Sequence, residues 1–185
     1  MPTHARERLL ATAEELFYAE GIRAVGLDRI LTESGVGRAS FYRHFPSKDD
    51  LVVAVLTDRD VRWRGWLAER VTALGGGPLN VFDALAERFE RADFRGCAFI
   101  NTIVETADPG SPAHHVAAAH KRAVTAYVAG LLAEDGCPDP AGTARSLVLL
   151  MDGAIVTALR EGSAEPAALA RAAAGALLPG GGRVG

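Results

Sequence analysis

Hydrophobic residues recur every three to four positions along most of the chain, and glycine and proline interrupt this pattern at intervals. Such spacing predicts amphipathic helices. The first three helical segments are short and lie at about residues 3–20, 27–34 and 38–45. Thr3 is a candidate N-cap of the first segment, because its hydroxyl can accept a backbone N–H. Gly21 and Gly35 follow the first two segments, and glycine there favours a left-handed end to a helix.

Six further helical segments follow, at about residues 47–74, 79–92, 97–107, 112–136, 140–161 and 164–178. The first of them opens with Ser47-Lys-Asp-Asp50, which resembles a capping box with Asp in place of the usual Glu. No stretch alternates with period two between turn signals, as a hairpin would. Alanine, the best helix former, is abundant. The sequence therefore predicts an all-α fold of about nine helices.

Composition adds limits to this picture. The chain has 185 residues, 49% of them hydrophobic and 23% charged, with a formal net charge of −3. These values are typical of a globular protein with its own core, and they exclude a polycation that coats nucleic acid. The best candidate for a membrane span, the apolar run at residues 147–151, is cut by Asp152, and the N-terminus has no apolar signal core. We therefore expect a cytoplasmic protein without a membrane partner.

The chemistry of residues 34–48 favours DNA recognition. Two short helical segments there are joined by Ser34-Gly-Val-Gly37, the pattern of a helix-turn-helix motif. Polar donors for phosphates or base edges come from Ser40, Tyr42 and His44. Three cations and no acid lie after the turn: Arg38, Arg43 and Lys48. A solvated cationic face on a helical bundle is the alternative, but turn spacing, length and charge together favour a DNA reader. Phe41 and Phe45 can anchor its last segment to a core.

One long motif resembles a known family. Residues 35–51, Gly-Val-Gly-Arg-Ala-Ser-Phe-Tyr-Arg-His-Phe-Pro-Ser-Lys-Asp-Asp-Leu, resemble the recognition segment of the tetracycline-repressor-like (TetR) family. Residues 13–17, Gly21 and residues 28–30 match its usual register. The resemblance covers residues 5–55 closely. The rest of the chain agrees in the number of helices, and residues 95–101 are loosely similar to one large subgroup of the family. It implies a three-helix DNA-binding head at residues 1–47, followed by a larger helical body.

The resemblance also assigns roles to individual residues of the head. The positions that would face or grip DNA are Arg38, Ala39, Ser40, Tyr42, Arg43, His44 and Lys48. Tyr42 and Lys48 fall where the family commonly holds phosphate. Val25-Gly26 stands where many members have Ser or Thr at the start of the second helix, which puts that phosphate contact in doubt. Ala39 replaces a frequent Gly, so its approach to a base can differ.

The resemblance implies that residues 48–178 bind an effector and form a homodimer through the last two long helices, and we expect a disordered tail at residues 179–185. Small residues support close packing there, for example Gly153, Ala158 and Ala173, although packing within one chain is the alternative. A two-fold dimer would set two recognition helices roughly 34–36 Å apart on a palindromic operator in double-stranded DNA.

An effector pocket is expected among the helices of the body. Its candidate lining residues are Trp63, Trp66, Phe82, Phe89, Phe99, Asn101, Ile103, His120, Tyr127, Met151, Asp152 and Ile155. Each apolar member has an alternative role in the core. Asp152 interrupts an apolar run, so its carboxylate needs a partner or a ligand. Aromatic and aliphatic walls with few polar groups would suit a small apolar or amphipathic molecule.

We therefore expect a one-component transcriptional regulator, a repressor released from its operator by a small ligand, with no cofactor and no enzymatic activity. The alternative from another class is an all-helical metal or redox sensor, or an enzyme, that uses Cys97 with His114, His115 and His120. The histidine spacing is poor for a metal site, and Cys97 lacks an activating neighbour in sequence. A third possibility is a DNA-binding dimer whose body holds no effector.

Overall fold

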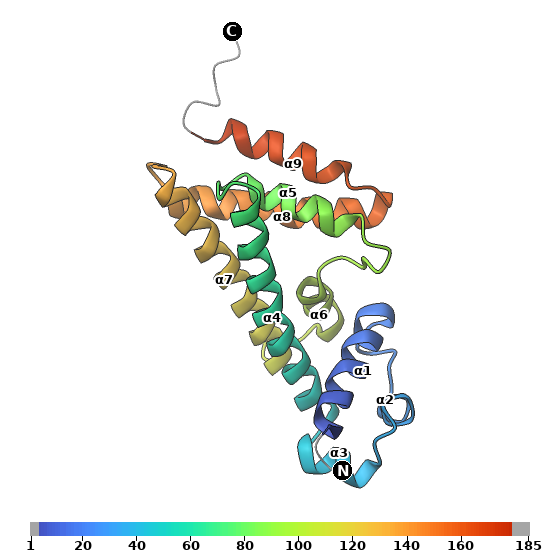
Figure 1. Cartoon of the computed structure of the whole chain (residues 1–185). Helices are drawn as coiled ribbons and strands as arrows, with labels where there is room; N and C mark the ends of the chain where they lie inside the picture. The colour runs from blue at the N-terminus through green and yellow to red at the C-terminus, as the bar shows by residue number, and fades with distance from the viewer. Residues whose placement is uncertain (1–3, 179–185) are drawn as a thin grey trace. The chain divides into compact units, whose positions relative to one another are not determined.

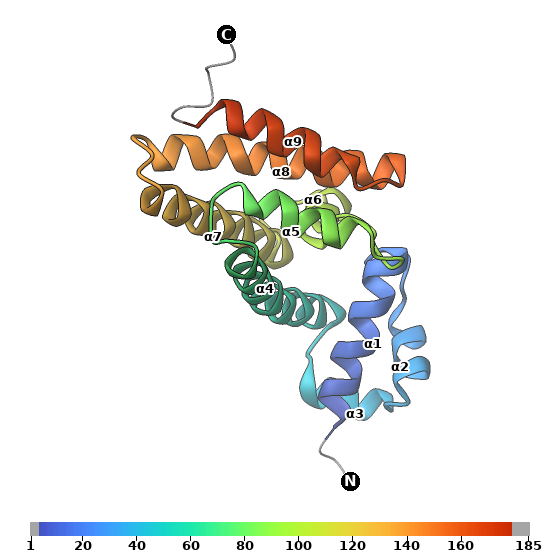
Figure 2. The ribbon, with the colours of Figure 1, turned by 45° about the horizontal axis from the view of Figure 1, so that its top comes forward.

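The described part of the chain, residues 4–178 of a computed structural model, contains helices and no strand (Figures 1 and 2). The helices are α1 (Ala5–Glu20), α2 (Leu27–Ser34), α3 (Arg38–His44), α4 (Lys48–Ala73), α5 (Asn80–Phe89), α6 (Ala98–Thr106), α7 (Pro112–Glu134), α8 (Pro140–Glu161) and α9 (Glu165–Ala176). The predicted all-α class and the nine segments are confirmed. Each boundary lies within a few residues of its prediction. The predicted Thr3 cap and the predicted tail at residues 179–185 lie outside the described residues.

The chain divides into two compact units. The first comprises residues 1–61 and 98–119, and the second comprises residues 62–97 and 120–185. Both α4 and α7 therefore begin in the first unit and end in the second. The sequence-based division at residues 47 and 48 separates the predicted recognition segments from the rest. The contacts of the structure instead keep the first half of α4 and all of α6 with α1–α3.

The core of the first unit fixes the helix-turn-helix. Phe41 of α3 has no exposed surface, and Phe45, just after α3, is 4% exposed. The two rings lie 5.9 Å apart, which confirms that they anchor the recognition segment. The rest of this core includes Leu9, Ala13, Leu16, Phe17, Val25, Ile30, Val36, Leu51 and Val52.

Local signals of the head act as the sequence predicts at Gly35 and Ser47. At Gly21 the left-handed end is not formed, because φ 94° and ψ 151° lie in an extended region that glycine alone adopts readily. Gly35 adopts the left-handed conformation with φ 63°, and the N–H of Val36 reaches back to the Leu31 carbonyl at 3.2 Å, which closes the end of α2. The Ser47 hydroxyl accepts the N–H of Asp50 at 3.2 Å and donates to its carboxylate at 2.6 Å. Ser47 therefore caps α4 as predicted, and the Asp50 carboxylate pairs with the Ser47 hydroxyl where a full capping box would use the Ser47 backbone N–H.

The second unit is built around α8 and α9, which pack against each other and against α5. Small side chains make this packing close: Ala154, Ala158, Ala167, Ala170 and Ala174 are all at least 92% buried within the chain. Ala158, which the sequence offered as a dimer contact, thus belongs to the intrachain core. Gly153 and Ala173 are exposed and stay available to a partner.

Among the described residues, α8 is the one helix long and apolar enough to cross a membrane by length and composition. The sequence analysis had found no such stretch, because Asp152 interrupts the run. The buried side of α8 explains its apolar composition. Leu147, Met151 and Ile155 lie in the core of the second unit, while Leu149 and Val156 on the other side of α8 are exposed.

Candidate DNA-binding surface and effector site

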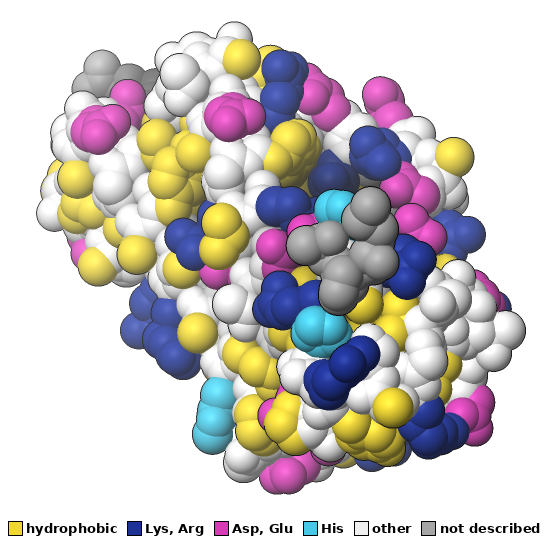
Figure 3. Space-filling view, turned by 60° about the horizontal axis from the view of Figure 1, so that its bottom comes forward, with side chains coloured by type: hydrophobic (Ala, Val, Ile, Leu, Met, Phe, Trp, Pro, Cys, Tyr) yellow, Lys and Arg dark blue, Asp and Glu magenta, His cyan; other side chains and the backbone are white. Residues whose placement is uncertain are grey.

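The outer face of α3 is exposed and polar, opposite the buried Phe41. Ala39, Tyr42, Arg43 and His44 are exposed, with half of the Tyr42 surface open to solvent. The view that brings the lower end of Figure 1 forward shows Lys, Arg and His side chains facing the viewer together (Figure 3). Such a face can offer donors to phosphates and base edges.

Arg38, one of the predicted DNA contacts, is already engaged within the head. Its guanidinium forms an ion pair with the Asp28 carboxylate of α2, and both side chains are more than half exposed. Exposed pairs of this kind contribute little stability, typically below about 1 kcal/mol. Arg38 can therefore exchange Asp28 for a DNA group at small cost.

Lys48, predicted to hold phosphate, points toward the α1–α2 turn in this structure. Its ammonium donates to the Ile22 carbonyl at 2.5 Å and lies 5.7 Å from the centre of the Phe17 ring. Burial lowers the pKa of Lys48, while the charges of Asp49 and Glu105 act in the opposite direction. Lys48 thus has a structural contact besides any contact with DNA.

Glu105 of α6 contacts the turn between α1 and α2. Its carboxylate accepts the backbone N–H of Arg23 at 3.0 Å, and the Arg23 guanidinium donates to the Thr106 carbonyl at 3.4 Å. Gly21 has φ 94°, and a Cβ there would lie 3.0 Å from the Glu105 carboxylate. Glycine at this position therefore allows α6 to approach the α1–α2 turn. No sequence periodicity could have found this link, because the partners are 82 residues apart.

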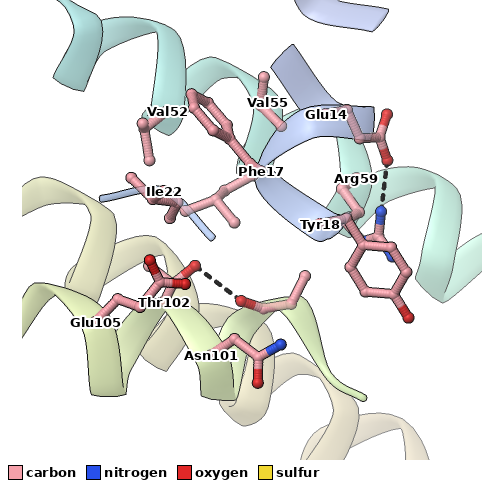
Figure 4. A pocket seen from close by; sticks show the side chains of 12 residues that line it. Glu14, Phe17, Tyr18, Ile22, Val52, Val55, Arg59, Asn101, Thr102 and Glu105 are labelled. Atoms are coloured by element: carbon pink, nitrogen blue, oxygen red, sulfur yellow. Dashed lines mark hydrogen bonds and ion pairs between the residues drawn. The ribbon is translucent and has the colours of Figure 1, made fainter. Parts of the chain in front are cut away.

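A small cavity of about 30 Å³ lies between α1, α4 and α6 in the first unit (Figure 4). Apolar side chains form most of its wall: Phe17, Ile22, Val52, Val55 and Leu56. At one end the Arg59 guanidinium pairs with Glu14 at 2.8 Å and lies 4.2 Å from the centre of the Tyr18 ring. Asn101 lines this cavity; none of the other predicted pocket residues does. The cavity has room for about two water molecules, so it is far too small for a drug-like ligand.

The remaining predicted pocket residues fall into two groups. Phe99 is buried and Ile103 is half-buried on α6 in the first unit. The second unit holds the others: Trp63, Trp66, Phe82, Phe89, His120, Tyr127, Met151, Asp152 and Ile155. Of these, Phe82, Phe89, Met151 and Ile155 belong to its buried core, and Trp63, Trp66 and Tyr127 pack against that core.

Three of the predicted pocket residues in the second unit carry polar groups: His120, Asp152 and Tyr127. His120 is 2% exposed, and its ring and that of Trp63 form a T-shaped pair with ring centres 5.0 Å apart. The Asp152 carboxylate of α8 forms an ion pair with Lys121 of α7, which answers the expectation that this acid needs a partner. Burial, followed by the charge of Glu134, raises the pKa of Tyr127. These groups give the α4–α7–α8 region both aromatic surface and directional polar atoms.

The residues of the alternative metal or redox site come from more than one segment. His114, His115 and His120 lie on α7, Cys97 lies just before α6, and Cys97 and Cys137 are both free thiols. Within residues 4–178, no group of three or more His, Cys, Asp or Glu side chains could hold a metal ion. The geometry gives this reading no support.

Both α8 and α9 carry exposed apolar side chains. Leu149 is 74% exposed and Val156, seven residues later on the same helical face, is 52% exposed. Gly153 lies between them, and Leu169 of α9 is 62% exposed. Large exposed apolar patches often mark an association surface, which makes these side chains candidates for a dimer contact.

Comparisons with known proteins agree with this architecture. Residues 9–55 match the model of the tetR family of bacterial regulatory proteins, and residues 112–180 match a tetracyclin repressor-like C-terminal domain. A TetR-family transcriptional regulator from Streptomyces coelicolor has a similar crystal structure, with 36% identity over 94% of this chain and 89% of that one, and a TM-score of 0.85. The reduced form of NemR from Escherichia coli is 27% identical over 95% of this chain and 97% of its own, with a TM-score of 0.81.

The similarity to curated proteins is more local. An HTH-type transcriptional regulator encoded in the lacX 3' region of Lactococcus lactis is 25% identical over 107 residues, which are 55% of either chain. The HTH-type regulator YxaF of Bacillus subtilis is 41% identical over 54 residues, 29% of this chain and 28% of its own. The matched stretch thus spans about half the length of these relatives or less.

Proposed function

Because this chain belongs to the TetR family of bacterial regulatory proteins, we propose that it is a homodimeric transcriptional repressor that leaves its operator when a small molecule binds. The observation that carries the DNA-binding part is the recognition helix itself. A buried Phe41 holds α3 against the head, while its exposed face carries cations and no acid. A surface of this kind can enter the major groove, where a short helix reads base edges.

The first test of this proposal removes single cations from the recognition surface. We expect Arg43→Ala to weaken operator binding, and to relax base preference at one position if Arg43 contacts guanine. Lys48→Ala should weaken binding about equally on all sequences and flatten the dependence of log K on log salt by about one unit. Fluorescence anisotropy at several salt concentrations measures both effects.

Thermal unfolding must accompany the Lys48 variant, because this side chain also bonds to the Ile22 carbonyl. Arg29→Ala is the matched control for Arg43→Ala. It removes one positive charge from the same head, but its guanidinium is occupied by Glu20 and Glu33 of α1 and α2. Unchanged operator binding by both the Arg43 and the Lys48 variants would refute the assignment of α3 as the DNA reader.

For the effector we propose the second unit, at the aromatic and polar groups of α4, α7 and α8. Trp63 supplies a flat apolar surface, and His120 and Asp152 supply polar atoms that fix orientation. A small amphipathic molecule fits this chemistry. Helix α4 is continuous from Lys48 at the head to Ala73 in the second unit, so a shift of α4 on binding would reach the head directly.

The coupling between effector and operator gives the second test. A library of small apolar and amphipathic compounds is screened by thermal shift against the intact chain. A compound that lowers operator affinity by some factor must itself bind more weakly, by the same factor, when operator is present; typical couplings are about 5- to 150-fold. Calorimetric titration with and without operator DNA measures this reciprocity.

Asp152→Asn should reduce the affinity for such a compound while operator binding in its absence remains. Asp83→Asn is the matched control, because Asp83 of α5 also pairs with a cation, Arg171, elsewhere in the second unit. If no compound changes either the unfolding temperature or the operator affinity, the effector part of the proposal fails. The DNA-binding part is unaffected, because it rests on other residues. If Asp83→Asn acts as strongly as Asp152→Asn, the effector is not bound at Asp152.

A further inference from the structure

The head contains a second basic feature beside the recognition surface. A hollow of about 420 Å³ opens between the N-terminal end of α1, the α2–α3 turn and the outer side of α3. All of its lining residues belong to the first unit: Ala5, Arg8, Gly35, Val36, Gly37, Ser40, Arg43 and His44. Figure 1 shows the start of α1 and the short helix α3 together at the same end of this unit.

Two arginines from different helices converge on this hollow, and none of its lining residues is acidic. Arg8 comes from the first turns of α1 and Arg43 from the last turn of α3, and both are exposed. Ser40 adds a hydroxyl and His44 an imidazole. The hollow therefore combines two guanidinium groups with neutral donors, which is the composition of a site for an oxyanion.

Arg8 and Arg43 differ from most other arginines of the chain in having no recorded acidic partner within residues 4–178. Several other arginines are held by acids: Arg29 by Glu20 and Glu33, Arg38 by Asp28, Arg59 by Glu14, Arg70 by Glu87, and Arg171 by Asp83. Within residues 4–178, the structure records no hydrogen bond, ion pair or ring contact for the side chain of Arg8 or of Arg43. An external anion can thus reach their guanidinium donors without displacing a partner in the described part of the chain.

We propose that this hollow binds one phosphodiester group of the operator backbone and that Arg8 is a DNA-contacting residue. This inference rests on the proposed DNA-binding function and extends the contact surface from α3 to the start of α1. A phosphate seated between Arg8 and Arg43 would fix the position of α3 relative to one strand. Contacts of this kind orient a protein on the duplex and carry no base preference of their own.

The test compares Arg8→Ala with the unmodified chain and with two matched variants. Arg8→Ala should weaken operator binding about tenfold and flatten the slope of log K against log salt by about one unit. The loss should be equal for the operator and for single-base variants of it, because a phosphate contact is blind to sequence. Arg8→Lys should retain most of the affinity, since a point charge still reaches a phosphate.

Arg29→Ala serves as the control for net charge, because it removes a cation of the same head that does not line the hollow. If Arg8→Ala binds operator as the unmodified chain does, with the same salt slope, the inference is overturned. The same holds if Arg29→Ala loses as much affinity as Arg8→Ala. In either case, weaker operator binding by Arg43→Ala would leave the proposed function intact. Failure of the unmodified chain to bind any duplex would refute that function itself.

A titration with inorganic phosphate tests whether the hollow binds the DNA backbone or a free anion. Nuclear magnetic resonance shifts on titration with phosphate, at constant ionic strength, report binding of the ion in the hollow. Weak shifts that vanish in Arg8→Ala, together with the loss of operator affinity, support the assignment. Arg8→Ala could instead abolish phosphate binding and leave operator affinity unchanged. That result would show a site for free anions and would overturn the proposed DNA contact.

Discussion

Phe41→Ala should destabilise the head by about 3–5 kcal/mol and abolish specific operator binding. Phe41 is fully buried, and its ring contacts the rings of Tyr42 and Phe45 at centre distances of 5.1 and 5.9 Å. Removal of this ring leaves a cavity between the short α3 and the core, and a helix of seven residues has little stability of its own. Urea unfolding followed by circular dichroism measures the loss.

The neighbouring residue supplies the control for this experiment. Tyr42 is half exposed, so Tyr42→Ala should cost the head much less free energy of unfolding while it weakens operator binding through a lost phosphate contact. The two variants thus separate anchoring from recognition. A Phe41→Ala protein that unfolds at the same urea concentration as the unmodified chain, or still binds operator normally, would contradict the account of how α3 is held.

Leu149→Glu should weaken the dimer by roughly 3 kcal/mol, or about a hundredfold in the dissociation constant. In a single chain Leu149 is 74% exposed, so the substitution leaves the core of the second unit intact. In a dimer formed by the outer faces of α8 and α9, the new carboxylate would be buried without a partner. Sedimentation equilibrium over a range of concentrations measures the effect, and operator affinity should fall with it.

Val104→Glu is the matched control for the dimer experiment, since Val104 of α6 is 73% exposed and lies on neither α8 nor α9. Ala173→Glu, on the exposed side of α9, should act in the same direction as Leu149→Glu. Ala158→Glu would not serve, because Ala158 is buried inside the chain and its substitution would unfold the second unit. Equal weakening by Val104→Glu and Leu149→Glu, or none by either α8 or α9 variant, would place the dimer contact elsewhere.

The sequence predicted the elements well because their signals are local. Helical periodicity, glycine at positions 21 and 35, and the Ser47 cap of α4 each depend on residues a few positions apart. Phe41 and Phe45 could be assigned to the core for the same reason, since residues four apart share a helical face.

Contacts between distant segments could not be predicted in this way. The small residues of α8 and α9 gave no indication of which side faces the chain's own core, so Ala158 and Ala173 looked equivalent. The link from Glu105 to the Arg23 backbone and the approach of Arg8 to Arg43 depend on how helices pack. Arg8 carried no sequence signal, because one arginine on an exposed helix is ordinary.

Selection of bound sequences from a random duplex library, with the purified intact chain, tests the central claim most directly. A dimer with one α3 in each half-site should enrich a two-fold symmetric sequence whose half-site centres are about 10 base pairs apart, or a multiple of that. Arg43→Ala should reduce the enrichment and Arg29→Ala should not. Failure to enrich any sequence, or enrichment of a single half-site without symmetry, would contradict the account.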